Sequence, residues 1–202
     1  MREDGSLGRP REFDEDEILL KIMDLFWDRG FADTSLSDIM RVTDLRKGSL
    51  YAAFGDKHAM YLKAIARYEA LVVDGASDIL RGPGDPLARL KAFLTAPVDA
   101  AWTAGDMRGC FLCNASADRA EQDAETRALV ARGFDKLERA VGAAVADLAP
   151  QLDAGARKAA STHMLSVYVG LRVMARSRLD RERMEGARDA ALASLAGPAT
   201  AG

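Results

Sequence analysis

Apolar residues recur along this chain at intervals of three and four positions, which is the spacing of an amphipathic helix. Over residues 14–29 they are Ile18, Ile22, Leu25 and Phe26, and the acidic residues that open this stretch suit the positive end of a helix dipole. Runs of β-branched residues are scarce, whereas Ala, Leu and Arg are abundant. The pattern therefore predicts an all-α protein.

The same pattern predicts about nine helices. They are expected over residues 14–29, from 36, from 47, and over 57–80, 87–102, 110–117, 126–148, 153–178 and 184–195. The Pro and Gly residues within 81–86 make the clearest break in the chain. We place a domain boundary slightly before this break, inside the long fourth helix, so that residues 1–60 form one domain and residues 61–202 a second.

The stretch 34–57 predicts two short helices joined by a tight turn and followed by the start of a longer helix. Thr34 and Ser35 are suited to cap the first of them, and Asp38 gives Ser35 a weaker form of the capping box. Residues 42–45 interrupt the apolar pattern, which resumes after them. Two short helices around a tight turn predict a helix-turn-helix.

The second short helix opens with Arg46-Lys47-Gly48-Ser49, which is unusual for an element that serves only a core. The N-terminus of a helix attracts anions through its free N–H groups and its dipole. Two cations there add a phosphate site, and a glycine lets the backbone approach a ligand closely. These features are those of a recognition helix that enters the major groove of DNA.

Residues 13–63, about a quarter of the chain, resemble the DNA-binding domain of the TetR/AcrR transcriptional regulators. The resemblance rests on Ile18-Leu19, Leu25-Phe26, Gly30-Phe31, Thr34-Ser35-Leu36, Asp38-Ile39, Lys47-Gly48-Ser49-Leu50-Tyr51, Phe54 and Lys57. It implies an N-terminal three-helix helix-turn-helix domain and a C-terminal helical ligand-binding and dimerisation domain. The implied function is that of a ligand- or redox-responsive repressor that binds palindromic double-stranded operator DNA as a homodimer.

A set of DNA-binding residues follows from this resemblance. They are Thr34, Ser35, Arg46, Gly48 and Lys57, together with Lys47, Ser49 and Tyr51, which are expected to contact the DNA backbone or bases. Arg46 is expected to read guanine, and Thr34 and Lys57 to hold phosphates. The chain departs from the family pattern at Asp44, where a glycine is usual, and at Arg46, where a Ser or Thr cap is common.

The charge of the chain argues mildly against a nucleic-acid partner. The net charge is −3, and acidic residues outnumber basic ones within residues 1–60. The alternative function is therefore a helical small-molecule-binding or adaptor protein with weak or no DNA binding. Residues 1–10, with Arg2, Arg9 and the neighbouring Arg11, are either an arm toward DNA or a solvated tail.

A ligand pocket in the second domain is implied by the resemblance alone. Its candidate residues are Phe93, Trp102, Met107, Cys110, Phe111, Asn114, Phe134, His163 and Tyr168. Most of them would belong to the core of any helical protein. Asn114, His163 and Tyr168 place polar atoms on apolar surfaces, where burial requires a ligand or a backbone partner. Aromatic residues with few charges indicate a small, mostly apolar effector.

Cys110 and Cys113 are spaced i, i+3, so that on a helix the two thiols lie on one face, close enough to bridge with some strain. A cysteine at a helix start has a lowered thiol pKa, which suits a sensor of oxidants or electrophiles. The alternative is a pair of small core residues. A zinc site needs about four ligands, and the two histidines are distant in sequence. We expect His58 to be a surface residue.

The helix expected over 153–178 carries apolar residues on more than one face, including Leu165, Tyr168 and Val173. Two apolar faces favour a second packing partner such as another copy of the chain, and residues 170–173 are similar to the dimer-forming helix of the family. The alternative is a helix buried within one large domain.

Other classes of protein find little support in the sequence. The chain contains no Gly-rich phosphate loop, nucleophile elbow or metal-ligand cluster, so we expect no enzyme, no cofactor and no bound metal. Because no apolar run reaches the length of a transmembrane helix, and the N-terminus does not resemble a signal peptide, we expect a cytoplasmic protein.

Overall fold

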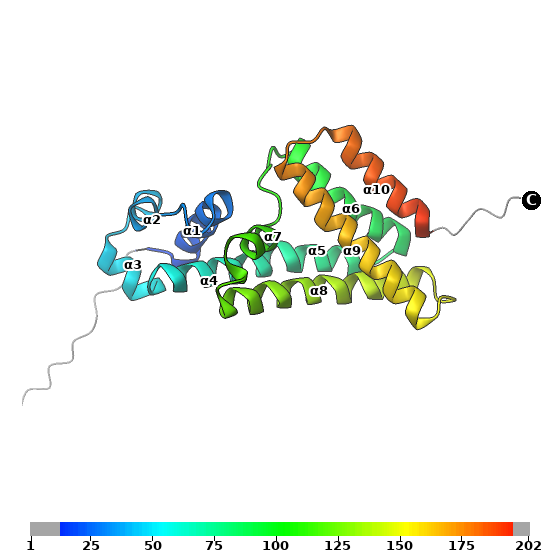
Figure 1. Ribbon diagram of the computed structural model, residues 1–202, viewed down its shortest axis with the longest axis horizontal. Coiled ribbons are helices and arrows are strands. Elements are labelled where there is room, and N and C mark those ends of the chain that lie inside the picture. The colour runs from blue at the N-terminus through cyan, green and yellow to red at the C-terminus, as the bar shows by residue number, and fades with distance from the viewer. Residues whose placement is uncertain (1–12, 196–202) are drawn as a thin grey trace, which may run out of the picture.

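The computed structural model describes residues 13–195, and the arm expected within residues 1–11 lies outside them. Over this range the chain is helical and contains no strand, which confirms the predicted fold class. Figure 1 shows three short helices at one end of an elongated molecule and a bundle of longer helices at the other. One long helix joins the two parts.

The helices begin and end close to the predicted positions. They are α1 (Glu15–Arg29), α2 (Leu36–Thr43), α3 (Lys47–Phe54), α4 (Lys57–Tyr68), α5 (Asp74–Arg81), α6 (Pro86–Trp102), α7 (Phe111–Ala115), α8 (Ala124–Leu148), α9 (Ala154–Arg176) and α10 (Arg181–Leu195). A π-helical segment, Glu69–Val73, makes α4 and α5 one continuous helix, so residues 13–195 hold nine helices in all. A second π-helical segment, Ser116–Ala120, extends α7.

Aspartate begins most of the longer helices. The side chains of Asp14, Asp56, Asp85, Asp123 and Asp153 accept backbone N–H bonds at the starts of α1, α4, α6, α8 and α9. Each such cap stabilises a helix by about 1 kcal/mol relative to alanine. Part of the acidic composition of the chain therefore serves to stabilise the starts of helices.

Helix α2 begins with a complete capping box, although the sequence predicted only a weak one. The Ser35 hydroxyl accepts from the Asp38 N–H at 3.1 Å, and the Asp38 carboxylate accepts from the Ser35 N–H at 3.1 Å. Hydrogen bonds from Ser35 and Arg41 hold the pKa of Asp38 below its usual range. The box therefore persists at any pH at which Asp38 stays ionised.

One hydrophobic core runs through both ends of the molecule. At the N-terminal end α1 packs on α4, and Phe26 and Tyr61 lie edge to face with ring centroids 5.1 Å apart. Tyr61 and Tyr68 of the same long helix each contact Phe111, at 5.8 and 5.7 Å between centroids. Phe111 opens α7, so a shift of α7 would be felt directly by the N-terminal helices.

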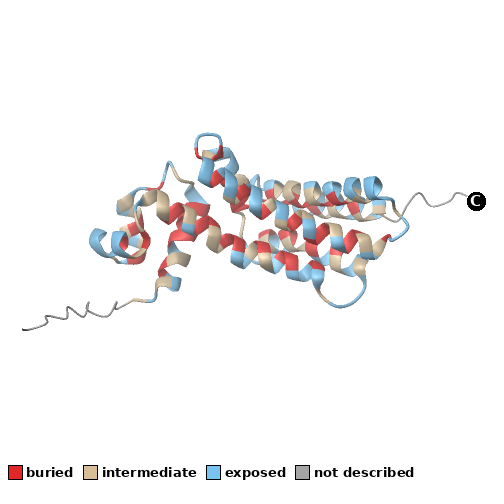
Figure 2. Cartoon of the chain, turned by 90° about the horizontal axis from the view of Figure 1, so that it is seen from below, coloured by how far each residue is buried: buried red, intermediate tan, exposed pale blue. Residues whose placement is uncertain are grey.

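The C-terminal bundle packs α8 along α4 and α5, and α9 across α6 and α8 (Figure 1). Helix α10 covers α6 and α9. Figure 2 shows the buried residues following the lines where these helices meet. Tyr168, one of the apolar residues that the sequence places on more than one face of α9, is buried and stacks on Phe93 at 4.2 Å between centroids.

Candidate nucleic-acid interface and sensing site

Helix α3 turns a cationic, uncapped end to solvent. Arg46, Lys47 and Ser49 are exposed, whereas Leu50 and Phe54 on the opposite face are buried. Arg46 holds the N-cap position and makes no side-chain cap, so the first backbone N–H groups of α3 stay free for a ligand. This end of α3 can therefore bind an anion both by charge and by backbone N–H groups.

Two further residues shape this surface. Tyr51 is 40% exposed, and the Lys47 ammonium lies 5.3 Å from the centre of its ring. Asp44 ends α2 in the left-handed conformation, with φ of 55° and ψ of 27°. This conformation explains why a glycine is usual here, and aspartate is among the residues that tolerate it best.

The side chains of the other predicted DNA-binding residues are less accessible to DNA. Thr34 is fully buried and its hydroxyl donates to the Gly30 carbonyl at 2.7 Å, so the prediction that its side chain holds a phosphate does not fit this position. The Ser35 hydroxyl is exposed but engaged in the capping box. Lys57 is partly buried, with its ammonium 4.3 Å from the centre of the Phe31 ring.

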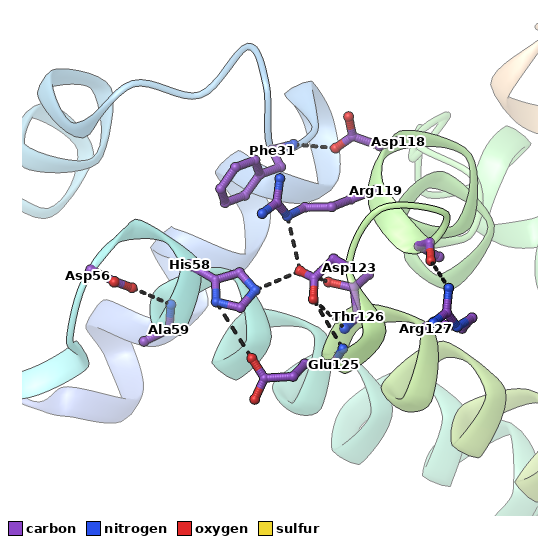
Figure 3. Close-up of polar contacts among 11 residues, drawn as sticks. Phe31, Asp56, His58, Ala59, Asp118, Arg119, Asp123, Glu125, Thr126 and Arg127 are labelled. Atoms are coloured by element: carbon purple, nitrogen blue, oxygen red, sulfur yellow. Dashed lines mark hydrogen bonds and ion pairs between the residues drawn. The ribbon is translucent and has the colours of Figure 1, made fainter.

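His58 links the start of α4 to the start of α8 (Figure 3). Its Nε2 lies 2.6 Å from Asp123 Oδ2, and its Nδ1 lies 3.8 Å from Glu125 Oε2. Its side chain is 30% exposed, so the expectation of a free surface histidine was wrong. The two partners follow His58 by more than 60 positions, which no local pattern reveals.

Asp123 is the centre of this cluster. Its Oδ2 also accepts from Arg119 Nε at 3.0 Å and from the Thr126 hydroxyl at 2.9 Å (Figure 3). Burial alone would raise the pKa of Asp123, but the bonds from His58 and Thr126 outweigh it and hold the pKa below its usual range. Side-chain atoms of His58, Asp123 and Glu125 that could bind a metal ion lie within 4.8 Å of one another. However, Asp123 Oδ2 is already bonded to His58, Arg119 and Thr126. The arrangement is that of an ion-pair cluster.

The loop after α1 is held against the segment after α7. The Phe31 N–H donates to Asp118 Oδ2 at 2.6 Å, and the Arg119 guanidinium lies 4.1 Å from the centre of the Phe31 ring (Figure 3). These contacts fix the helix-turn-helix to the C-terminal bundle. A change around α7 would therefore alter the position of α2 and α3.

Some of the predicted pocket residues come together. Cys110, Cys113 and Asn114 line a cavity of about 450 Å³ between the end of α1, α7 and the end of α9. The Asn114 amide donates to the Arg108 carbonyl at 3.1 Å, so a backbone group is one of its partners. Phe111 lies behind this cavity in the aromatic core.

The other predicted pocket residues lie elsewhere. Trp102 is 40% exposed, and His163 is exposed. Met107 lines a separate hollow next to Asp28, and Phe134 lines one beside the π-helical segment after α7. Phe93 and Tyr168 form a closed stack inside the bundle, so the nine residues do not form one pocket.

Sequence reasoning missed the arginines of the 450 Å³ cavity. Arg29, Arg172 and Arg176 all line it, and Arg172 is buried. Arg172 stands between Leu171 and Val173 on a largely apolar helix, and this placement was the available signal.

The two cysteines are free thiols with unequal surroundings. Cys110 holds the N-cap position of α7 and is buried, and Cys113 is partly exposed. A hydrogen bond from Cys113 lowers the pKa of the Cys110 thiol against the effect of burial, and Tyr68 and Arg172 reinforce the lowering. The same hydrogen bond and burial raise the pKa of Cys113. Cys110 is therefore the more nucleophilic thiol.

Comparisons with known proteins bear on both ends of the molecule. Residues 18–64 match the family described as bacterial regulatory proteins, tetR family. Over its whole length the chain is similar to CifR, a TetR family transcriptional regulator whose cysteine mutant was solved with 26-base-pair operator DNA. The TM-score is 0.81 at 29% identity, over 93% of this chain and 99% of CifR. The chain belongs to the TetR family.

Other similar proteins are less identical or match over a shorter stretch. The transcriptional repressor ComR of Escherichia coli (strain K12) is 41% identical over 63 residues, which cover 31% of this chain and only 30% of ComR. The regulator YezE of Bacillus subtilis (strain 168) is 25% identical over 66% of this chain and 69% of YezE. The reduced form of Escherichia coli NemR shares the fold, with a TM-score of 0.76 at 20% identity over 87% of this chain and 93% of NemR. Within residues 13–195 no helix combines the length and hydropathy needed to cross a bilayer.

Proposed function

We propose that this TetR family protein is a transcriptional repressor that binds palindromic operator DNA as a homodimer. One observation carries the proposal: the first turn of α3 is cationic, exposed and uncapped, while the same helix is anchored by buried Leu50 and Phe54. Such a helix can enter a major groove without loss of core packing. The operator complex of the CifR mutant supports this assignment.

In this proposal residues 1–60 form the DNA-binding domain, and residues 61–202 form the domain for dimerisation and sensing. For the dimer, α9 offers a surface on which Val173 is 50% exposed and a side chain at Gly170 would meet open space. Small and apolar residues of this kind allow two helices to approach closely. A two-fold dimer would place two copies of α3 on successive half-sites of one operator.

The experiment that tests DNA binding is a salt titration with a duplex from the region upstream of the gene. If six or more phosphates are contacted per dimer, the affinity falls about 10³-fold or more between 50 and 200 mM salt. An unrelated duplex of equal length measures the non-specific part. No binding to either duplex at low salt would favour the alternative, a helical small-molecule-binding or adaptor protein.

We further propose that oxidation of Cys110 releases the DNA. Hydrogen peroxide would accept two electrons from the thiols of Cys110 and Cys113, which lose their two protons and form one S–S bond, while the peroxide becomes two molecules of water. The new bond would deform α7, whose first residue Phe111 contacts Tyr61 and Tyr68 of the long helix.

The Cys110→Ser variant should therefore keep its DNA affinity when treated with hydrogen peroxide, under conditions in which the wild type loses at least tenfold. Fluorescence anisotropy of labelled operator measures the difference. Cys113→Ser retains the Cys110 thiol but cannot close the bridge, so it should also keep its DNA affinity under peroxide. If Cys110→Ser releases DNA like the wild type, the thiol of Cys110 is not the sensor.

A further inference from the structure

The side chain of Arg172 is a buried charge without an acidic partner. It is 8% exposed, and its Nη2 donates to the Tyr168 hydroxyl at 2.9 Å. Its Nε is buried and has no hydrogen-bond partner. Within residues 13–195 no carboxylate forms an ion pair with it.

Burial of an unpaired guanidinium is costly, and a neutral phenol compensates only part of the cost. Asp106 is near enough for Arg172 to help lower its pKa, but its carboxylate makes no direct contact with Arg172 and instead accepts from the Arg108 Nε at 2.9 Å and from its Nη2 at 2.9 Å. The Cys110 thiol is also close enough to interact with Arg172, but it already shares a hydrogen bond with Cys113. Arg172 therefore retains the capacity to bind an anion.

The cavity beside Arg172 carries an excess of positive charge. Arg176 lines it with Arg172, and so does Arg29, although Arg29 pairs with Asp38 at 3.4 Å; Asp118 is the acidic residue of the lining and already accepts from the Phe31 N–H. Arg176 bonds only to carbonyl groups, at 3.1 Å to Arg108. The cavity volume of about 450 Å³ lies within the range of small-molecule sites.

We propose that this cavity binds a small organic carboxylate, whose carboxylate group pairs with Arg172. The proposal rests on the proposed function, because it names the chemical class of the effector. It adds a carboxylate group to the small, mostly apolar effector expected from the sequence, in a cavity that Trp102, Phe134 and His163 do not line. The Asn114 amide and the wall at Val173 would contact the rest of the ligand.

The position of the cavity makes such a ligand a natural effector. Its wall is formed by Arg29 and Gly30 of the DNA-binding end, by α7, and by the end of α9. Arg176 also reaches the Asp28 carbonyl at 3.5 Å, a contact between α9 and α1. A carboxylate that attracts Arg172 and Arg176 would weaken this contact and shift α1 with the helix-turn-helix.

The test is calorimetric titration of the full chain, without DNA and at fixed ionic strength, with benzoate and with benzamide. The two probes have nearly the same shape and differ in charge. Benzoate should bind at least tenfold more tightly than benzamide, and Arg172→Met should reduce benzoate affinity at least tenfold. The control Arg183→Met removes an exposed arginine of α10 that pairs with Asp180, and should bind benzoate like the wild type.

A second measurement serves if Arg172→Met does not fold. An anion beside Cys110 disfavours the thiolate, so benzoate but not benzamide should slow alkylation of Cys110 in the wild type at least threefold. Equal binding of the two probes, unchanged affinity in Arg172→Met, or equal alkylation rates would overturn the proposal. If the protein binds benzoate through Arg172 but binds no DNA, the carboxylate site is supported and the repressor function is overturned. If it binds operator DNA but not benzoate, the repressor function is supported and the carboxylate site is overturned.

Discussion

Replacement of Lys47 and Tyr51 together by alanine should lower the affinity for operator DNA by about 100-fold or more. Both side chains are exposed on α3, next to its uncapped first turn. A dimer would lose four contacts, and each charged or polar contact to DNA contributes about 1 kcal/mol. Anisotropy with labelled operator at 100 mM salt measures the loss.

The double variant should remain as stable as the wild type, because neither side chain is part of the core. Lys158→Ala, which removes an exposed cation at the far end of α9, is the matched control and should bind DNA normally. Wild-type affinity in the double variant, together with a normal melting temperature, would mean that α3 does not read DNA. The proposed repressor function would then fail.

The helix-turn-helix could be predicted because its determinants are local. The capping box of α2 involves Ser35 and Asp38, three residues apart, and the buried face of α3 follows from the spacing of Leu50 and Phe54. Even the unusual Asp44 occupies the left-handed conformation that its place in the turn requires. Each of these features depends on a single turn of backbone.

Local reasoning failed where two distant segments meet. His58 and Asp123 are separated by 65 positions, so their ion pair depends on how α4 and α8 pack. Threonine is a common helix cap, so the sequence favoured an exposed Thr34. In the structure the loop after α1 brings the Thr34 hydroxyl to the Gly30 carbonyl, to which it donates. The period of a helix shows that two faces are apolar and not which of them is covered, so it did not show that Tyr168 is buried while Val173 is 50% exposed.

The ligand cavity was the least predictable feature. Its lining comes from α1, α7 and α9, and its most informative residue is a buried arginine rather than an aromatic side chain. Sequence reasoning found Asn114 by its polarity on an apolar face and the two cysteines by their spacing. It could not find Arg172, because the absence of a carboxylate partner is a property of the folded chain.

Gly109→Ala should destabilise the protein by about 3 kcal/mol, a lowering of the melting temperature by roughly 6–12 °C. Gly109 has φ of 75°, a conformation that costs an alanine about 1 kcal/mol or more. A Cβ atom there would also lie 2.7 Å from the Arg172 carbonyl oxygen, a backbone atom that cannot move aside without α9. The two costs add because both arise at one residue.

Gly105→Ala separates these two costs. Gly105 has φ of 73°, but a Cβ atom at this position meets no atom within 4 Å. It should therefore lose about 1 kcal/mol from conformation alone. Both variants are compared by thermal unfolding at equal protein concentration, because the proposed dimerisation would make the melting temperature concentration-dependent. Equal losses at the two glycines would show that the segment before α7 does not press on α9 at this point. The close approach that brings Cys110 beside Arg172 would then be wrong, and with it the geometry of the cavity.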